Sequence, residues 1–318
     1  MTIIGPYEHV LKYICLSTDT KPTVNVAIGS EAFERDTNLL YIFDGSVWSL
    51  SNINKLSMEL VSEAGVAYGV KHISNKPRVS SMPYLYDIAE GNVSNHVSLN
   101  KFGHNDTIGT SYETIWTGSS LYPYMTAADQ LEIVSDDADD TSAGNGARTV
   151  RIYGLDGDWN EINETVTLNG LTQVTTTASF IRIFRAQVVT AGATGINEGT
   201  IIIRDQDTDA TRAQIDPGLG QTLMATWTVP LGYSFYMTSW YAGSAISKII
   251  DIGVWARDNT VSNASWQNKQ FINFTDSVFN HKLEFPIKFT SKTDIEIRAK
   301  VSVAGGDLSA GFNGWYEI

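Results

Sequence analysis

The chain has 318 residues, of which 42% are hydrophobic and only 18% are charged. A chain of this length can bury a large core without disulfides or metals, and the single cysteine, Cys15, excludes an internal disulfide. The net charge of −13, with no run of lysines or arginines, argues against nucleic acid or an anionic membrane surface as a partner.

The N-terminal residues carry no targeting pattern. The start, MTIIGPYEHVLKYICLS, lacks a basic segment followed by a continuous apolar one, so we expect no export signal. No run of about 18 apolar residues occurs anywhere, so we expect no membrane-spanning helix.

The first predicted structure is a small β-meander in VAIGSEAFERDTNLLYIFDGSVWSL, which starts at Val26. An Asp-Gly pair between two apolar segments indicates a hairpin there. Isolated hairpins are marginally stable in water, so we expect residues 1–55 to pack on the rest of the chain or on another subunit as an attachment segment. The side chains that we expect at this interface are aromatic: Phe33, Tyr41, Phe43 and Trp48.

Residues 56–103 are predicted to be a connector with one short helix. Ser81 can cap this helix, Pro83 suits its first turn, and Gly91 can end it in the left-handed conformation.

From about His104 to the end, apolar and polar residues alternate with the period of a β-strand. In DIEIRAKVSV, residues 294–303, every second residue is apolar, which predicts a strand with one buried face. Further segments of this kind are 148–153, 164–168, 180–189, 200–204, 223–229, 234–241, 249–255, 271–274, 283–289 and 311–316. Residues 104–318 are therefore predicted to form an antiparallel β-sandwich of jelly-roll type, either one large sandwich or two smaller ones.

The stretch STDTKPTVNVAIGSEAFERDTNLLYIFDGSVW resembles a segment found at the front of tailed-bacteriophage virion proteins. The matching positions are Thr20 to Thr23, Gly29, Ser30, Asp36, Thr37, Tyr41, Phe43, Asp44, Gly45 and Trp48. The central segments YDIAEGNVSNHVSLNKFGHNDTIGTSYETIW, ARTVRIYGLDGDWNEINETVTLNG and TWTVPLGYSFYMTSWYA are similar to an uncharacterised structural protein of marine and freshwater phages.

This resemblance implies a non-enzymatic virion subunit that is assembled in the cytoplasm of a host bacterium. It also implies a homotrimer that contacts phage capsid or tail proteins. We expect a capsid decoration protein that docks through its N-terminal segment. The alternative is a tail fibre or adaptor that contacts the host, with a surface glycan as a possible receptor.

One acidic segment, DQDTDATRAQID, mimics the spacing of a calcium loop. Its carboxylates are Asp205, Asp207, Asp209 and Asp216. Ala210 stands where the loop needs glycine and the flanks are predicted strands, so a hairpin turn is favoured over a metal site. The acidic loop SDDADD, residues 135–140, could also gather calcium at a subunit junction, although such loops are usually solvated.

A glycan-degrading enzyme is the third option, because Asp156, Asp158 and Glu161 could supply the two carboxylates of glycoside hydrolysis. A turn between two strands is the much stronger explanation of these residues, because acidic pairs are inevitable in a chain with 35 acidic residues. The histidines have no metal-ligand spacing, and no nucleophile or phosphate-binding motif occurs, so we expect no cofactor and no catalysis.

Aromatic residues are frequent in the last third of the chain, and exposed rings there could stack on sugars. The residues concerned are Trp227, Trp240, Tyr241, Trp255 and Trp266. Aromatic residues in half-buried strands usually belong to a core or a subunit contact, which is the interpretation that we favour.

Overall fold

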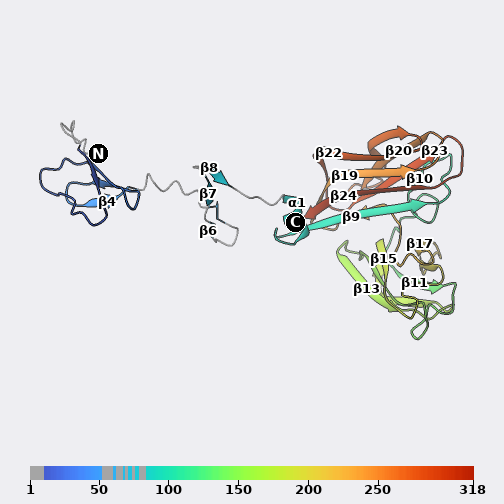
Figure 1. Cartoon of the computed structure of the whole chain (residues 1–318). Coiled ribbons are helices and arrows are strands. Elements are labelled where there is room, and N and C mark those ends of the chain that lie inside the picture. The colour runs from blue at the N-terminus through green and yellow to red at the C-terminus, as the bar shows by residue number, and fades with distance from the viewer. Residues whose placement is uncertain (1–10, 52–59, 62–66, 69–70, 74–75, 79–83) are drawn as a thin grey trace. The chain divides into compact units, whose positions relative to one another are not determined.

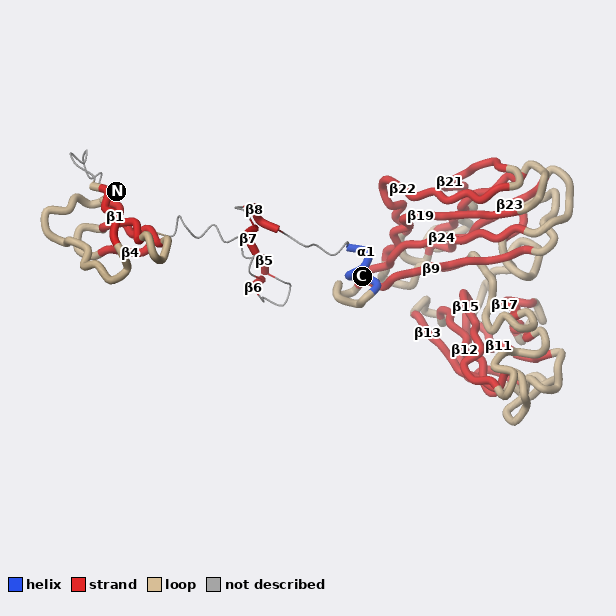
Figure 2. Tube along the Cα trace, in the orientation of Figure 1, coloured by secondary structure: helices blue, strands red, loops and turns tan. Residues whose placement is uncertain are grey.

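Nearly all regular structure among the described residues is β-strand, which confirms the predicted all-β class (Figure 2). The computed structural model describes residues 11–51, 60–61, 67–68, 71–73, 76–78 and 84–318. The chain divides into two compact units, Met1–Ser81 and Met82–Ile318 (Figure 1). No helix in the described ranges is long and apolar enough to cross a membrane. The sequence-based ranges 1–55, 56–103 and 104–318 stay predictions.

The first unit contains a four-stranded sheet in the order β1-β2-β3-β4. Its strands are β1 (Lys12–Cys15), β2 (Glu31–Glu34), β3 (Leu39–Phe43) and β4 (Trp48–Leu50). The last three form the predicted meander, and β1 pairs with β2 in parallel. In the predicted hairpin turn the Asp44 carboxylate accepts the backbone N–H of Ser46 and of Val47, each at 2.8 Å. Gly45 has a φ of 106°, a conformation that glycine adopts without a steric penalty.

The segment that follows contains two short antiparallel pairs. β5 (Leu60–Val61) pairs with β6 (Ala67–Tyr68), and β7 (Lys71–Ile73) pairs with β8 (Lys76–Arg78).

The predicted short helix is α1 (Tyr84–Ala89), at the start of the second unit. Gly91 follows it with a φ of 73°, as expected for a glycine that ends a helix. The predicted cap, Ser81, and Pro83 lie outside the described residues.

The body of the second unit is a jelly roll of two packed sheets. Its strands are β9 (His96–Asn105), β10 (Glu113–Thr114), β18 (Thr226–Thr228), β19 (Ser234–Ser244), β20 (Ile250–Asp258), β21 (Gln267–Phe274), β22 (Ser277–Phe289), β23 (Thr293–Val301) and β24 (Leu308–Glu317). One sheet has the order β22-β19-β24-β9, and the other β10-β23-β20-β21 with β18 also on β23. The strand pairs are nested: β9 pairs with β24, β10 and β18 with β23, β19 with β22, and β20 with β21. This is the topology of a long hairpin rolled into a jelly roll.

The second strand of this jelly roll is interrupted by a large insertion. β10 and β18 both pair with β23, and the backbone N–H of Ala225 donates to the carbonyl of Ile115 at 2.9 Å where the chain leaves and returns. β9 passes directly over this junction at Gly103, where a Cβ atom would lie 2.1 Å from the carbonyl oxygen of Ile115. The inserted residues, 116–224, form a structure of their own.

The insertion is a second, seven-stranded sandwich. Its strands are β11 (Asp129–Ser135), β12 (Ala147–Leu155), β13 (Glu161–Thr167), β14 (Val174–Phe180), β15 (Arg182–Ala191), β16 (Ile201–Asp205) and β17 (Thr211–Ile215). They form the sheets β14-β11-β16-β17 and β13-β12-β15. Each sandwich has its own hydrophobic core. Residues 104–318, for which the sequence predicted either one large sandwich or two smaller ones, therefore contain two.

The prediction that residues 294–303 form a strand with only one buried face is wrong, because both faces of β23 contain buried residues. Its apolar residues, such as Ile295 and Ile297, lie in the jelly-roll core as predicted. Asp294 and Glu296, on the face expected to be solvated, are also completely buried. The physical reason is the insertion, because Arg182 of β15 reaches Asp294 from the second sandwich.

Candidate docking face and inter-sandwich cleft

One face of the N-terminal sheet is apolar and open to solvent. Ile14 lies opposite Phe33, and Phe33 lies opposite Leu40, so the three side chains point to one face. Ile42 shares this face because it follows Leu40 by two residues. Ile14 is 73% exposed and Phe33 is 36% exposed, while Leu40 and Ile42 are half-buried. We call these four residues the outer face of the N-terminal sheet.

The opposite face is covered by the loop that joins β1 to β2. Lys21 of this loop forms an ion pair of 2.5 Å with the buried Glu34, and its ammonium lies 4.3 Å from the centre of the Tyr41 ring. The hydrogen bond from Lys21 lowers the pKa of Glu34, and the same bond raises the pKa of Lys21. Trp48 donates its Nε1–H to the carbonyl of Pro22 at 2.7 Å.

The structure separates the four predicted interface residues. Phe33 lies on the outer face, whereas Tyr41, Phe43 and Trp48 lie on the covered face, and Phe43 is only 2% exposed. Lys21, Tyr41, Phe43 and Trp48, which are among the positions of the phage resemblance, make contacts within the small sheet and its covering loop. Sequence reasoning missed the rest of the outer face, and alternation along each strand together with the strand register is what defines it.

A buried ionic network joins the two sandwiches. The Asp294 carboxylate accepts Nε–H and Nη2–H of Arg182 at 2.8 and 3.0 Å, Nη2–H of Arg257 at 2.6 Å, and the Thr228 hydroxyl at 2.7 Å. Arg182 also donates to the carbonyl of Met125 at 2.8 Å. These bonds fix the second sandwich to the sheet that contains β23.

The two buried carboxylates of β23 differ in electrostatics. Burial alone would raise the pKa of Asp294, but Arg182, Arg257 and the Thr228 hydroxyl hold that pKa below its usual value. Burial raises the pKa of Glu296 despite its contacts with Arg298 and with Thr114. Asp294 is therefore stabilised in its charged form, whereas the charged form of Glu296 is disfavoured.

A second contact between the sandwiches contains a cavity of about 430 Å³ along β9. Glu161 lines it and accepts the Tyr316 hydroxyl at 3.0 Å, and desolvation raises the pKa of Glu161. Glu161 is the only carboxylate residue that lines this cavity. Asp156 instead holds a turn by accepting the backbone N–H of Asp158 and of Asn160, each at 2.9 Å. The paired carboxylates of glycoside hydrolysis do not line this cavity.

The calcium-like segment forms the hairpin turn between β16 and β17. Asp205 accepts the Ala210 backbone N–H at 3.0 Å and Nη2–H of Arg212 at 2.9 Å. Burial would raise the pKa of Asp205, but the bonds from Arg212 and Thr208 lower it.

The other three aspartates of this segment have separate partners. The Asp207 backbone N–H bonds to Asp129, the Asp209 carboxylate pairs with Arg204, and the Asp216 carboxylate accepts from Gln214. Across the described part of the chain, no three His, Cys, Asp or Glu side chains gather as a metal site.

The loop SDDADD is organised around one buried carboxylate. Asp140 is completely buried and accepts the backbone N–H groups of Ala147, Glu198 and Gly199 at 2.7 to 3.0 Å, together with the Ser135 hydroxyl at 2.7 Å. This loop ties β11, β12 and the segment before β16 together, so Asp140 has a structural role.

Of the five aromatic residues singled out in the last third, two are core residues, and Tyr241, Trp255 and Trp266 are half-buried. Trp227 and Trp240 are each 1% exposed within the jelly-roll core. Trp266 is half-buried, and the Arg298 and Arg257 guanidinium groups lie 4.2 and 4.8 Å from its ring centre.

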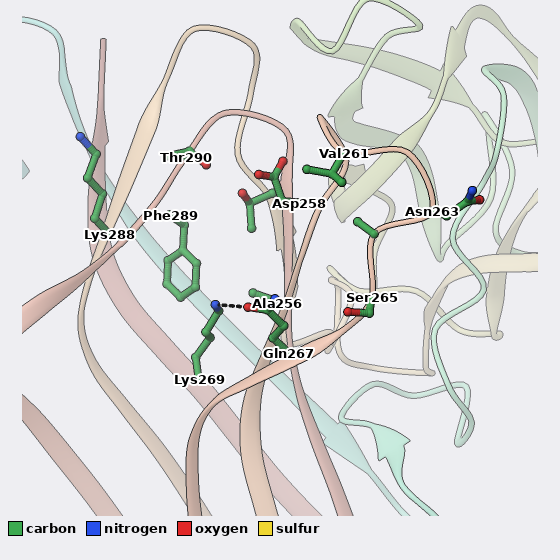
Figure 3. Close-up of a pocket in the computed structure, with 12 residues that line it drawn as sticks. Ala256, Asp258, Val261, Asn263, Ser265, Gln267, Lys269, Lys288, Phe289 and Thr290 are labelled. Carbon is green, nitrogen blue, oxygen red and sulfur yellow. Dashed lines mark hydrogen bonds between the residues drawn. The ribbon is translucent and has the colours of Figure 1, made fainter.

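A further pocket, of about 500 Å³, lies between the loop after β20 and the end of β22 (Figure 3). Its charged groups have neighbours: Lys269 donates to Gln267 at 2.6 Å, and Asp258 accepts the Thr260 hydroxyl at 2.7 Å. Asp258 is the carboxylate residue among those that line the pocket, so the lining holds no carboxylate pair.

Comparison with known proteins gives little. No family model matches the chain, and no curated protein matches it. Among solved structures, that of the infectious bursal disease virus Gt strain aligns at 11% identity over 74% of this chain and 77% of that one, with a TM-score of 0.16. The VP2 subviral particle of the same virus aligns at 10% identity over 74% and 82%, with a TM-score of 0.14. Alignments at such TM-scores carry no argument about this chain.

Proposed function

We propose that the chain is a non-enzymatic structural subunit of a bacteriophage particle, a decoration protein on the head surface that attaches through its N-terminal unit. The proposal combines the sequence resemblance with the architecture of the second unit. Jelly rolls are common in viral capsid proteins, although lectins and cupins also use them, so the fold supports a virion role without defining it.

The outer face of the N-terminal sheet carries the attachment part of the proposal. A four-stranded sheet that leaves Ile14 and Phe33 exposed presents apolar surface that a protein partner would cover. Lys12 and Glu31 form an ion pair of 3.1 Å beside it, which gives the face a polar border. Such an apolar centre with a polar rim is typical of protein interfaces.

The test is incorporation of variants into particles. Ile14→Asp combined with Phe33→Asp places two charges on the outer face and leaves the covered face intact. We expect this variant to stay soluble and folded but to be missing from purified particles. Val24→Asp is the matched control, because Val24 is 77% exposed in the loop that covers the opposite face. Incorporation of the double variant at the wild-type level would remove the attachment proposal.

Gold-conjugated antibody separates the two positions in the particle. Label spread over the head supports decoration. Label confined to the tail supports the second candidate, a fibre or adaptor that contacts the host. The cavity along β9 is the observation that favours this candidate. The homotrimer implied by the resemblance is part of the proposal, and its test is the mass of the purified chain in solution by light scattering.

A further inference from the structure

The cavity along β9 lies between the two sandwiches of the second unit. Ser98 to Lys101 of β9 form one wall, and β12, β13 and β15 of the insertion supply the other. In Figure 1, β9 is the jelly-roll strand beside the inserted sandwich. Its volume of about 430 Å³ is in the range of small-molecule sites, which hold about 300–1,000 Å³.

Two cations line this cavity without a carboxylate partner. Lys101 is only 3% exposed, and its ammonium contacts the carbonyl oxygen of Phe184. Arg185 is half-buried and donates one Nη2–H to the carbonyl of Asn100 at 2.8 Å. Neither residue forms an ion pair with any acid of the described chain, although acidic residues outnumber basic ones by 35 to 22.

The buried Lys101 and the half-buried Arg185 need an explanation, because charges removed from water in proteins are normally paired. Burial lowers the pKa of Lys101 and of Arg185, and the Arg185 charge lowers that of Lys101 further. An anion in the cavity would favour the charged forms of Lys101 and Arg185 and so raise both pKa values again. The structural alternative is that the two side chains only join the sandwiches through carbonyl groups.

The remaining walls suggest what would carry the anion. Tyr153, Phe184, Trp227 and Tyr316 are aromatic, and Gln187 donates to the Tyr153 hydroxyl at 3.0 Å. Glu161 adds a single acceptor at the Tyr316 end. Aromatic walls with a few amide and hydroxyl groups suit a sugar ring, which has apolar faces and hydroxyl edges.

We propose that this cavity binds a carboxylate-bearing sugar residue, with its carboxylate held by Arg185 and Lys101. The inference goes beyond the structural role in the particle and does not depend on whether the chain sits on the head or on the tail. Guanidinium and carboxylate form strong charge-assisted hydrogen bonds, so the carboxylate is the group that defines selectivity.

The test is calorimetric titration of the purified full chain with the trisaccharide of galacturonic acid and with the neutral galactose trisaccharide. We expect the acidic trisaccharide to bind at least about tenfold more tightly than the neutral one. Gln187→Glu adds a carboxylate of the same shape to the cavity and is expected to weaken binding of the acidic trisaccharide by at least about tenfold. Arg185→Gln should do the same.

Arg148→Gln is the matched control, because Arg148 also donates to a carbonyl, that of Gly144 at 3.0 Å, but does not line the cavity. This variant should bind like the wild type. Equal affinity for both trisaccharides, no binding up to about 10 mM, or unchanged binding by Gln187→Glu would each overturn the proposal. Because Gln187 does not join the sandwiches, that variant remains informative even if Arg185→Gln fails to fold.

Discussion

The buried carboxylates of β23 lead to the sharpest prediction about stability. Asp294→Asn keeps the size of the side chain but removes the negative charge that faces Arg182 and Arg257. The amide can accept fewer of the three guanidinium bonds, and each hydrogen bond to a charged group contributes about 1.5–3 kcal/mol. Removing one partner of a buried ion pair destabilises by about 3–5 kcal/mol, so we expect a loss of that size.

Glu296→Gln is the matched control on the same strand. The charged form of Glu296 is already disfavoured, so neutralising it should change the free energy of unfolding by less than about half the loss for Asp294→Asn. Urea denaturation followed by circular dichroism gives both values, with the transition of each sandwich fitted separately if two are resolved. A loss below about 1 kcal/mol for Asp294→Asn, or a larger loss for Glu296→Gln, would refute the reasoning.

The pH dependence of the first variant follows from the same electrostatics. The pKa of Asp294 is lower in the folded protein than in the unfolded chain, where it is about 3.9. The stability that Asp294 contributes is therefore present above that value and is lost as the pH falls through the folded pKa. The difference in unfolding free energy between the wild type and Asp294→Asn should stay constant from about pH 7 to pH 5 and shrink only at lower pH.

Three further predictions concern the framework. Gly103→Ala should lower the free energy of unfolding by at least about 1 kcal/mol in urea denaturation, because the new Cβ would lie 2.1 Å from the carbonyl oxygen of Ile115. Asp140→Ala should cost at least about 2 kcal/mol in the same assay, since it leaves three backbone N–H groups, two of them buried, without their acceptor; a wild-type midpoint would contradict this role. Asp205→Asn should lower the melting temperature, whereas Asp207→Asn should change stability by less than about 0.5 kcal/mol. A calcium-dependent melting temperature that Asp207→Asn abolishes would instead indicate a metal site.

Alternation along the chain predicted most of the fold, because a strand with one solvated face shows its period directly. Each predicted strand range overlaps an observed strand. β11 was missed because three consecutive residues, Leu131, Glu132 and Ile133, are all buried, which hides the period. β14 was missed because three consecutive threonines resemble a loop, and β17 because it lies in the acidic segment that the sequence predicted to be a hairpin turn.

The site could be predicted less well, because its parts are far apart in the sequence. Asp294 and Arg182 are 112 residues apart, and nothing in either segment indicates that they meet. The segment at Asp205 forms the hairpin turn that the sequence predicted, and Asp205 accepts the Ala210 backbone N–H within it. The cavity along β9 had no local signal, because Lys101 and Arg185 come from different sandwiches.

The insertion also decides which surfaces are left for partners. The second sandwich packs along β9 and β18, so that side of the jelly roll is covered. On the other side β21 and β22 end their sheets, and Phe271, Val278 and Phe285 are 49%, 82% and 78% exposed there. The pairing of β22 with β19 shifts register between Ser239 and Met237, which leaves Phe285 in a bulge. A bulged edge resists the addition of a further strand, so a neighbouring subunit that packs on this side would do so through side chains.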